Sequence, residues 1–190
     1  MLDLISAHRY LYFLIKNQGS IAEFEQWLYS NDELEQILGE QEYYEFISRN
    51  YKNKYAFLET EKQVYRIIQL GRFEQERLEL LLNELLTLED ASRQLEIMHV
   101  LYEEYCSGYS FLRYIALTYI TTSDEYKEML IEDKQKSNSF ITGVRREASR
   151  LLGFFGRNEI IIEEEHDFID HRTEKDRIEM HSIDKMLNQK

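Results

Sequence analysis

Apolar residues recur along this chain at intervals of three and four, the spacing that places them on one face of an α-helix. The first stripe, over residues 4–15, consists of Leu4, Ala7, Leu11, Leu14 and Ile15, and Gly19 follows where a helix usually ends. Ser20 and Glu23 have the spacing of a capping box, which predicts a new helix start. Shorter stripes continue to Tyr51 and predict three short helices in a bent arrangement.

Longer stripes follow between residues 60 and 156. A helix over residues 60–70 is expected to stop at Gly71, and the next one carries the stripe Leu78, Leu81, Leu82, Leu85 and Leu88. Residues 111–120 are almost wholly apolar, which predicts a central core helix. A further helix is predicted after residues 137–139, with one face formed by Ile141, Val144, Ala148, Leu151, Leu152 and Phe155.

The pattern changes beyond Gly156. The β-branched run at residues 160–162 predicts either one short strand near residues 159–163 or a helix start. From residue 163 onward charges crowd together and apolar positions thin out, although a final helix could use Met180, Ile183 and Leu187. We therefore expect a single helical domain over residues 1–162 and a charged C-terminal segment over residues 163–190, either mobile or folded as a final helix. The length of the chain also allows two closely packed halves.

Composition strengthens the helical interpretation. The 190 residues include no proline and only seven glycines. Helix interiors exclude proline because it lacks an N–H donor and clashes with the preceding turn. We expect an all-α fold, an irregular bundle of about eight to ten helices. So few glycines also leave little room for the irregular loops that usually carry catalytic groups.

Acidic residues outnumber basic ones by 36 to 23, and the formal net charge is −13. Residues 1–50 alone hold nine acids and three bases. The electrostatic field of so acidic a chain disfavours nucleic acid and anionic membranes as partners and favours a basic protein. The alternative is that the acidic residues only keep the protein soluble. The chain start lacks a basic signal region, no apolar run approaches the ~20 residues of a membrane span, and Cys106 is the single cysteine, so we expect a cytoplasmic protein.

One segment, residues 163–171, is dense in side chains that can bind metal. On a helix His166 and Asp170 would lie one turn apart, and with His171 they could offer ligands to zinc, manganese or iron. Helical metal sites also need ligands from other helices, and no second pair of histidine and acid occurs upstream. We expect a solvated charged segment with no metal and no cofactor, and the alternative is a metal-dependent enzyme using His166, Asp170 and His171.

No catalytic motif occurs elsewhere. Phosphate-binding glycine loops, the GxSxG turn and CxxC pairs are absent. Cys106 and His99 are seven positions apart on one expected helix, which separates them by about 10 Å, too far for a base to activate a thiol. We expect a buried inert Cys106, a core His99 and no enzymatic activity. The basic residues of the segment 134–157 are expected to pair with acids of the same chain, and the alternative is contact with phosphate or nucleic acid.

The chain contains 14 tyrosines, several of them beside acids. Tyrosine suits protein interfaces because it combines contact area and a polar tip with few rotatable bonds, although it also fills the margins of helical cores. Tyrosine with Asp or Glu on one surface would complement Lys and Arg of a partner.

Residues 21–54 resemble a recurring segment of immunity proteins from bacterial polymorphic toxin systems. The resemblance rests on Phe24-Glu25-Gln26-Trp27-Leu28-Tyr29, Leu34-Glu35, Leu38-Gly39, Tyr43-Tyr44, Ile47 and Asn50-Tyr51-Lys52. This is a helix-packing pattern, so the resemblance implies a cellular role and no catalytic residues.

Charge, tyrosine content and this resemblance lead to one hypothesis: a helical protein that neutralises a basic toxin domain by covering its active site. The expected contact residues are acidic and aromatic side chains, namely Glu23, Glu25, Trp27, Tyr29, Asp32, Glu33 and Glu35. The alternative is a helical adaptor or regulatory protein whose residues 163–190 are ordered by a partner.

Overall fold

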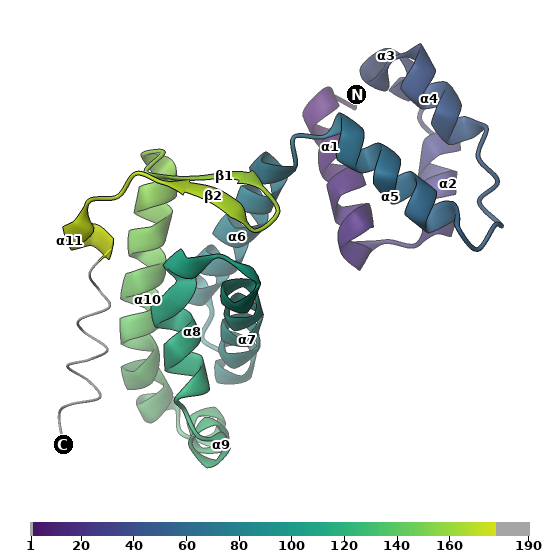
Figure 1. The fold of residues 1–190 in the computed structure, drawn as a ribbon. Coiled ribbons are helices and arrows are strands. Elements are labelled where there is room, and N and C mark those ends of the chain that lie inside the picture. Colours follow the sequence, from purple (N-terminus) through teal and green to yellow (C-terminus); the bar gives the residue numbers. More distant parts are fainter. Residues whose placement is uncertain (1, 178–190) are drawn as a thin grey trace. The chain divides into compact units, whose positions relative to one another are not determined.

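The structure is a computed structural model that describes residues 2–177, except for the side chains of residues 17 and 18. Contacts divide the chain into two compact units, Met1–Phe73 and Glu74–Lys190, each with its own hydrophobic core. The predicted single domain over residues 1–162 therefore spans parts of both units. The described part is helical apart from one two-stranded sheet, so the expected all-α class with a short strand is confirmed (Figure 1).

The first unit is built from short helices around an aromatic core. They are α1 (Leu4–Phe13), its π-helical continuation η1 (Leu14–Gln18), α2 (Ile21–Tyr29), α3 (Leu34–Leu38), α4 (Glu40–Ile47) and α5 (Ala56–Ile67). The buried ring of Phe24 has Phe46 and Tyr51 edge-on at 5.4 and 5.7 Å. The first apolar stripe is buried here except for Leu4, which is 49% exposed.

Side-chain caps and one glycine set the helix ends of this unit. The carboxylate of Asp3 accepts from the Ser6 N–H at 2.7 Å and caps α1. The predicted capping box is confirmed, because Ser20 Oγ accepts from the Glu23 N–H at 3.1 Å and the Glu23 carboxylate accepts from the Ser20 N–H at 2.8 Å. Gly39 joins α3 to α4 with φ 89°, in the region that favours glycine. The three short helices predicted after Ser20 are thus α2, α3 and α4.

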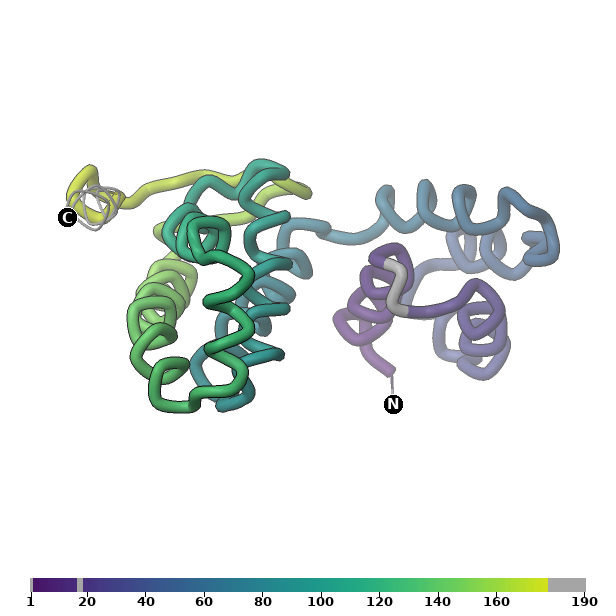
Figure 2. Tube along the Cα trace, turned by 90° about the horizontal axis from the view of Figure 1, so that it is seen from below, coloured from purple at the N-terminus to yellow at the C-terminus, as the bar shows by residue number. Residues whose placement is uncertain are grey.

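One predicted boundary is wrong. The helix expected to stop at Gly71 ends at Ile67, and the backbone of Ile68 is extended with φ −97° and ψ 152°. Gly71 lies in the first turn of α6 (Leu70–Thr87), through which the chain passes into the second unit (Figure 2). Ile68 leaves the helix in a conformation open to any residue, so no glycine is needed at this end.

The second unit packs α8 against both α7 and α10. Besides most of α6, its helices are α7 (Ala91–Ser107), the 3-10 turn η2 (Ser110–Leu112), α8 (Arg113–Ile120), α9 (Asp124–Glu132) and α10 (Lys134–Gly156). The predicted central helix is η2 with α8, of which Ile115 and Ala116 are fully buried while Ile120 is 52% exposed. Asp133 starts α10 earlier than predicted by accepting from the N–H groups of Gln135 and Lys136 at 3.0 and 3.1 Å.

A hairpin follows α10 and leads to the short helix α11 (Glu174–Arg177). The predicted strand is β1 (Ile160–Glu164), and it pairs antiparallel with β2 (Asp167–Asp170), which was not predicted. In this register Ile162 is opposite Phe168 and Ile160 is opposite Asp170. Figure 1 shows the hairpin at one end of α10, which β1 contacts.

The hairpin tip is anchored to the end of α7. The Tyr109 hydroxyl accepts from the His166 N–H at 3.0 Å. Gly108 has φ 146°, and a Cβ there would lie 3.0 Å from the His166 carbonyl oxygen, so this position requires glycine. Residues 163–177 of the expected charged segment therefore belong to a hairpin and a helix, whereas the expected final helix with Met180, Ile183 and Leu187 lies outside the described residues.

Leu82→Ala is expected to lower the free energy of unfolding by about 3 kcal/mol, because it removes a fully buried side chain and leaves a cavity. The matched control is Leu80→Ala on the same helix, where the side chain is 58% exposed and the loss should stay below about 0.5 kcal/mol. Urea unfolding followed by circular dichroism measures both. Equal losses would contradict the assignment of the buried stripe.

Candidate functional site

The seven predicted contact residues all lie in the first unit, on α2, on α3 and on the connection between them. The exposed ones are Glu23, Tyr29, Asp32, Glu33 and Glu35. Glu25 and Trp27 are half-buried. Most of the predicted contact residues are therefore accessible to a partner, but their side chains do not all have the same role.

Three of these side chains serve the structure of the unit itself. Glu23 is part of the capping box, and the hydrogen bonds from Ser20 hold the pKa of Glu23 below its ordinary value. The Glu33 carboxylate accepts from the Leu2 N–H at 2.8 Å. The Trp27 ring stacks on Tyr10 with centroids 4.1 Å apart. A partner that used these three side chains would have to compete with their interactions inside the unit. Glu23, Trp27 and Glu33 are therefore weak candidates for recognition.

The other carboxylates, Glu25, Asp32 and Glu35, form no ion pair with any described residue. Acids on the neighbouring α4 differ, since Arg66 reaches the Glu42 and Glu45 carboxylates at 2.8 and 2.7 Å. The Arg66 hydrogen bond also holds the pKa of Glu42 below its ordinary value.

Tyr29 lies four positions after Glu25 on α2, on the same side of the helix. Its ring is 57% exposed, and its hydroxyl donates to the Ile47 carbonyl at 3.2 Å. We call Glu25, Tyr29, Asp32 and Glu35 the α2–α3 acidic surface.

The residues considered for a metal site lie on the hairpin of the second unit and not on a helix. His166 is at the turn with φ 63°, Asp170 ends β2, and His171 follows it. They are not one helical turn apart as the helical interpretation required. Within residues 2–177 no three His, Cys, Asp or Glu side chains are grouped as metal ligands.

Cys106 and His99 are placed differently from the expectation, because both lie toward the solvent side of α7. Cys106 is exposed and not buried. The His99 side chain is 49% exposed, 3.7 Å from the Glu103 carboxylate and beside the ring of Tyr119 at 5.3 Å. The apolar pattern of a helix alone does not show whether a residue at the edge of its apolar face is buried or exposed.

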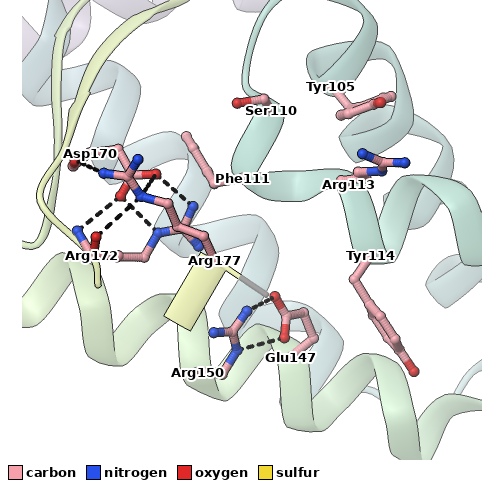
Figure 3. A pocket seen from close by; sticks show the side chains of 10 residues that line it. All are labelled: Tyr105, Ser110, Phe111, Arg113, Tyr114, Glu147, Arg150, Asp170, Arg172 and Arg177. Carbon is pink, nitrogen blue, oxygen red and sulfur yellow. Dashed lines mark hydrogen bonds and ion pairs between the residues drawn. The ribbon is translucent and has the colours of Figure 1, made fainter. Parts of the chain in front are cut away.

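A pocket of about 260 Å³ lies in the second unit, among η2, α8, α10 and the chain after the hairpin (Figure 3). It is lined by Tyr105, Ser110, Phe111, Arg113, Tyr114, Glu147, Arg150, Asp170, Arg172 and Arg177. The lining holds four guanidinium groups and two carboxylates. Guanidinium groups thus outnumber carboxylates among the described lining residues.

On the α10 side, one buried ion pair forms the wall. Arg150 Nε and Nη2 donate to the two Glu147 carboxylate oxygens, both at 2.8 Å, and the Glu147 side chain is 2% exposed. Arg150 Nη1 donates to the Asp176 carbonyl at 2.6 Å, which ties α11 to α10. The bidentate geometry fixes the plane of the guanidinium group.

On the hairpin side, Arg172 Nε and Nη2 donate to the two Asp170 carboxylate oxygens, both at 2.9 Å. Arg177 holds the chain around this pair, donating from Nε to the Arg172 carbonyl at 3.1 Å and from Nη2 to the Asp170 carbonyl at 2.5 Å. The Arg172 guanidinium also lies 5.3 Å from the centre of the Phe154 ring.

Strand alternation explains why a carboxylate lies here. Asp170 is opposite Ile160, which is fully buried, so both side chains are on the face of the hairpin that meets the helices. Burial alone would raise the pKa of Asp170, but the hydrogen bonds and charge of Arg172, with the charge of Arg177, hold it below its ordinary value. The group is therefore a carboxylate at neutral pH.

Arg113, Arg172 and Arg177 were not among the predicted site residues. Arg150 belongs to the basic segment expected to pair with acids, and its residues differ in their partners: Arg150 pairs with Glu147, whereas Arg145 donates to the carbonyls of Leu85 and Leu88. The missing signal was the second strand, because only a hairpin places Asp170 on the buried face.

No protein-family model, curated protein or solved structure matches this chain. The resemblance of residues 21–54 to toxin immunity proteins thus stays a prediction. Among the described helices, none has the combination of length and apolarity that crossing a bilayer requires.

Asp170→Asn is expected to lower the free energy of unfolding by about 2 kcal/mol at neutral pH, because it leaves the Arg172 guanidinium without its counter-charge. The pKa of Asp170 is depressed in the folded state, so its stabilising effect is present above its ordinary pKa of 3.8 and is lost as the pH falls below it.

The difference between the wild-type chain and Asp170→Asn should therefore be constant well above pH 3.8 and shrink as the pH falls from 3.8 through the lower pKa of the folded state, measured by urea unfolding. The control is Asp167→Asn on the same strand, an exposed residue that forms no ion pair within residues 2–177. A difference that does not change with pH would refute the role of the carboxylate.

Proposed function

We propose that this is a cytoplasmic, non-enzymatic protein that binds a basic toxin domain and neutralises it by covering its active site. The observation that supports the proposal is the α2–α3 acidic surface. Its three carboxylates form no ion pair with a described residue, and the exposed Tyr29 follows one of them by four positions on α2. Carboxylates already paired within a chain would have to lose those partners on binding, whereas these three would not.

The α2–α3 acidic surface would affect both the rate of association and the affinity. Unpaired surface carboxylates raise the local concentration of a basic partner and speed its association, an effect that salt screens. The broad ring of Tyr29 adds apolar contact area at small entropic cost. The resemblance of residues 21–54 to immunity proteins supports the same role, since it covers the helices that carry this surface.

The role is tested by capture of partners from the lysate of the native cell. A captured basic protein is expressed alone in a test host and then together with this chain. Toxicity that the chain relieves would support neutralisation. A captured protein without toxicity would contradict it and favour the adaptor alternative.

The surface is tested by combining Glu25→Lys, Asp32→Lys and Glu35→Lys. The triple variant should slow association with the captured partner by about 10- to 100-fold at low ionic strength and flatten its salt dependence. Stopped-flow or surface-based kinetics over a range of salt concentrations measure both.

The matched control is Glu125→Lys, Glu128→Lys and Glu132→Lys on α9, three exposed acids that form no ion pair with a described residue. This triple makes the same change in net charge elsewhere on the chain. Equal slowing by the two triples would assign the effect to net charge, and no slowing by the first would remove the α2–α3 acidic surface from the interface.

A further inference from the structure

We propose that two pairs of glutamate and tyrosine, Glu25–Tyr29 on α2 and Glu40–Tyr44 on α4, each bind a lysine or arginine side chain of the basic partner. The nature of that partner rests on the proposed function, and the proposal extends the contact surface from α2 and α3 onto α4. Three features carry it: ring faces that no internal cation covers, carboxylates one helical turn away without an ion pair, and the same two groups holding a lysine elsewhere in the chain.

The exposed tyrosines of the described chain differ in what their rings contact. They are Tyr29, Tyr44, Tyr55, Tyr65 and Tyr126. Lys54 lies over the Tyr55 ring, 4.7 Å from its centre, and the Tyr126 ring is edge-on to Phe140 at 6.1 Å. Tyr65 also interacts with another residue of the chain. These three rings are therefore engaged within the protein.

Tyr29 and Tyr44 are the most exposed of the five, at 57% and 67%. No cation and no aromatic ring of a described residue contacts either of their rings. The Tyr29 hydroxyl donates to the Ile47 carbonyl, which fixes the position of the ring while the ring stays exposed. An open ring face attracts a cation, because the π-system carries partial negative charge.

Each of these two rings has a carboxylate one helical turn before it. Glu25 precedes Tyr29 by four positions on α2, and Glu40 precedes Tyr44 by four positions on α4. This spacing places both members of a pair on one side of their helix. Neither glutamate forms an ion pair with a described residue. A cation that lies over the ring can therefore meet the carboxylate at the same time.

The second unit contains the same combination with a cation in place. The Lys127 ammonium lies 4.1 Å from the centre of the Tyr119 ring and 3.2 Å from the Asp124 carboxylate. The Lys127 side chain is only 18% exposed, so a ring and a carboxylate together hold a lysine largely out of water. The pairs on α2 and α4 offer the same two groups to a cation from outside.

The two pairs lie close enough for one partner to use both. The Tyr29 hydroxyl reaches the Ile47 carbonyl at 3.2 Å, and Ile47 is three positions after Tyr44 on α4. Tyr44 is therefore one turn from the contact between the two helices. Glu45, on another side of α4, pairs with Arg66 of α5, so Tyr44 is directed away from α5.

The ring face is tested with Tyr44→Leu and Tyr44→Phe in the full chain, using surface-based kinetics with the captured basic partner. Leucine keeps apolar contact but has no π-system, whereas phenylalanine keeps the ring. Tyr44→Leu should raise the Kd about fivefold or more, and Tyr44→Phe should stay within about twofold of the wild-type chain.

The matched control is Tyr55→Leu, since Tyr55 is 52% exposed on the same unit and its ring is already covered by Lys54. Its Kd should stay within about twofold of the wild-type value. No change with Tyr44→Leu, or equal weakening by Tyr44→Leu and Tyr44→Phe, would overturn the proposal. Self-association of the wild-type chain that Tyr44→Leu abolishes would assign the surface to a second copy and would also overturn it.

The pairing of glutamate and tyrosine is tested with Glu40→Gln alone and together with Tyr44→Leu. Because one cation contacts both groups, the double variant should raise the Kd by less than the product of the two single effects. An effect equal to that product would show that the two groups act separately, which would refute the paired site.

A titration of the full chain with a hexaarginine peptide separates this site from the toxin-binding role. In nuclear magnetic resonance spectra the ring signals of Tyr29 and Tyr44 should shift, those of Tyr55 should not, and added salt should reduce the shifts. Such shifts together with a captured partner that is not toxic would keep the cation site and refute the toxin role. Relief of toxicity without these shifts, or with equal shifts at Tyr55, would keep the toxin role and refute the cation site.

Discussion

The packing of one hairpin face against helices is the interaction on which the pocket of the second unit depends. Ile160 and Ile162 are buried in the helical core, and the Phe168 ring meets Phe111 edge-on at 4.9 Å. Since side chains alternate along a strand, this packing turns Asp170 toward the helices as well. Arg172 pairs with Asp170 at this face, and Arg177 donates hydrogen bonds to the backbone carbonyls of both residues.

In the second unit, the buried carboxylates are paired with arginine side chains. Glu74, which is fully buried, and Glu104 share Arg77, whose Nη2 lies 2.5 and 2.7 Å from their carboxylates. Glu147 and Asp170 are held in the same way by Arg150 and Arg172. A buried carboxylate is tolerated only with such a partner, and the planar guanidinium group satisfies two oxygens at once.

This use of arginine also decides where the positive charge of an acidic chain lies. Arg49, Arg77 and Arg172 have side chains 7%, 14% and 6% exposed, so part of the positive charge lies inside the units. Exposed acids such as Asp32 and Glu35 then have no internal counter-charge among the described residues. The unpaired acids of the first unit and the arginine-lined pocket of the second follow from the same distribution of charge.

The pattern of apolar residues and caps was enough to predict most helices. The stripe of α1, the capping box at Ser20 and the buried leucines of α6 depend on neighbours within a few turns, so the local sequence carries them. The same pattern wrongly predicted a helix end at Gly71 and a buried Cys106. Where a helix ends, and which residues at its margin are exposed, depend on the elements that pack against it.

The sequence by itself determined the all-α class, the short first-unit helices and the excess of acid at residues 1–50. Only the tertiary structure decided that Asp167–Asp170 forms a strand, because a charged four-residue segment has no strand signal until β1 lies beside it. The pocket depended on that pairing, since it brings the Asp170–Arg172 pair to the Glu147–Arg150 pair of α10 and to Arg113 of α8, which come from separate parts of the chain. Tertiary packing brings these residues together, and no local pattern of residues predicts it.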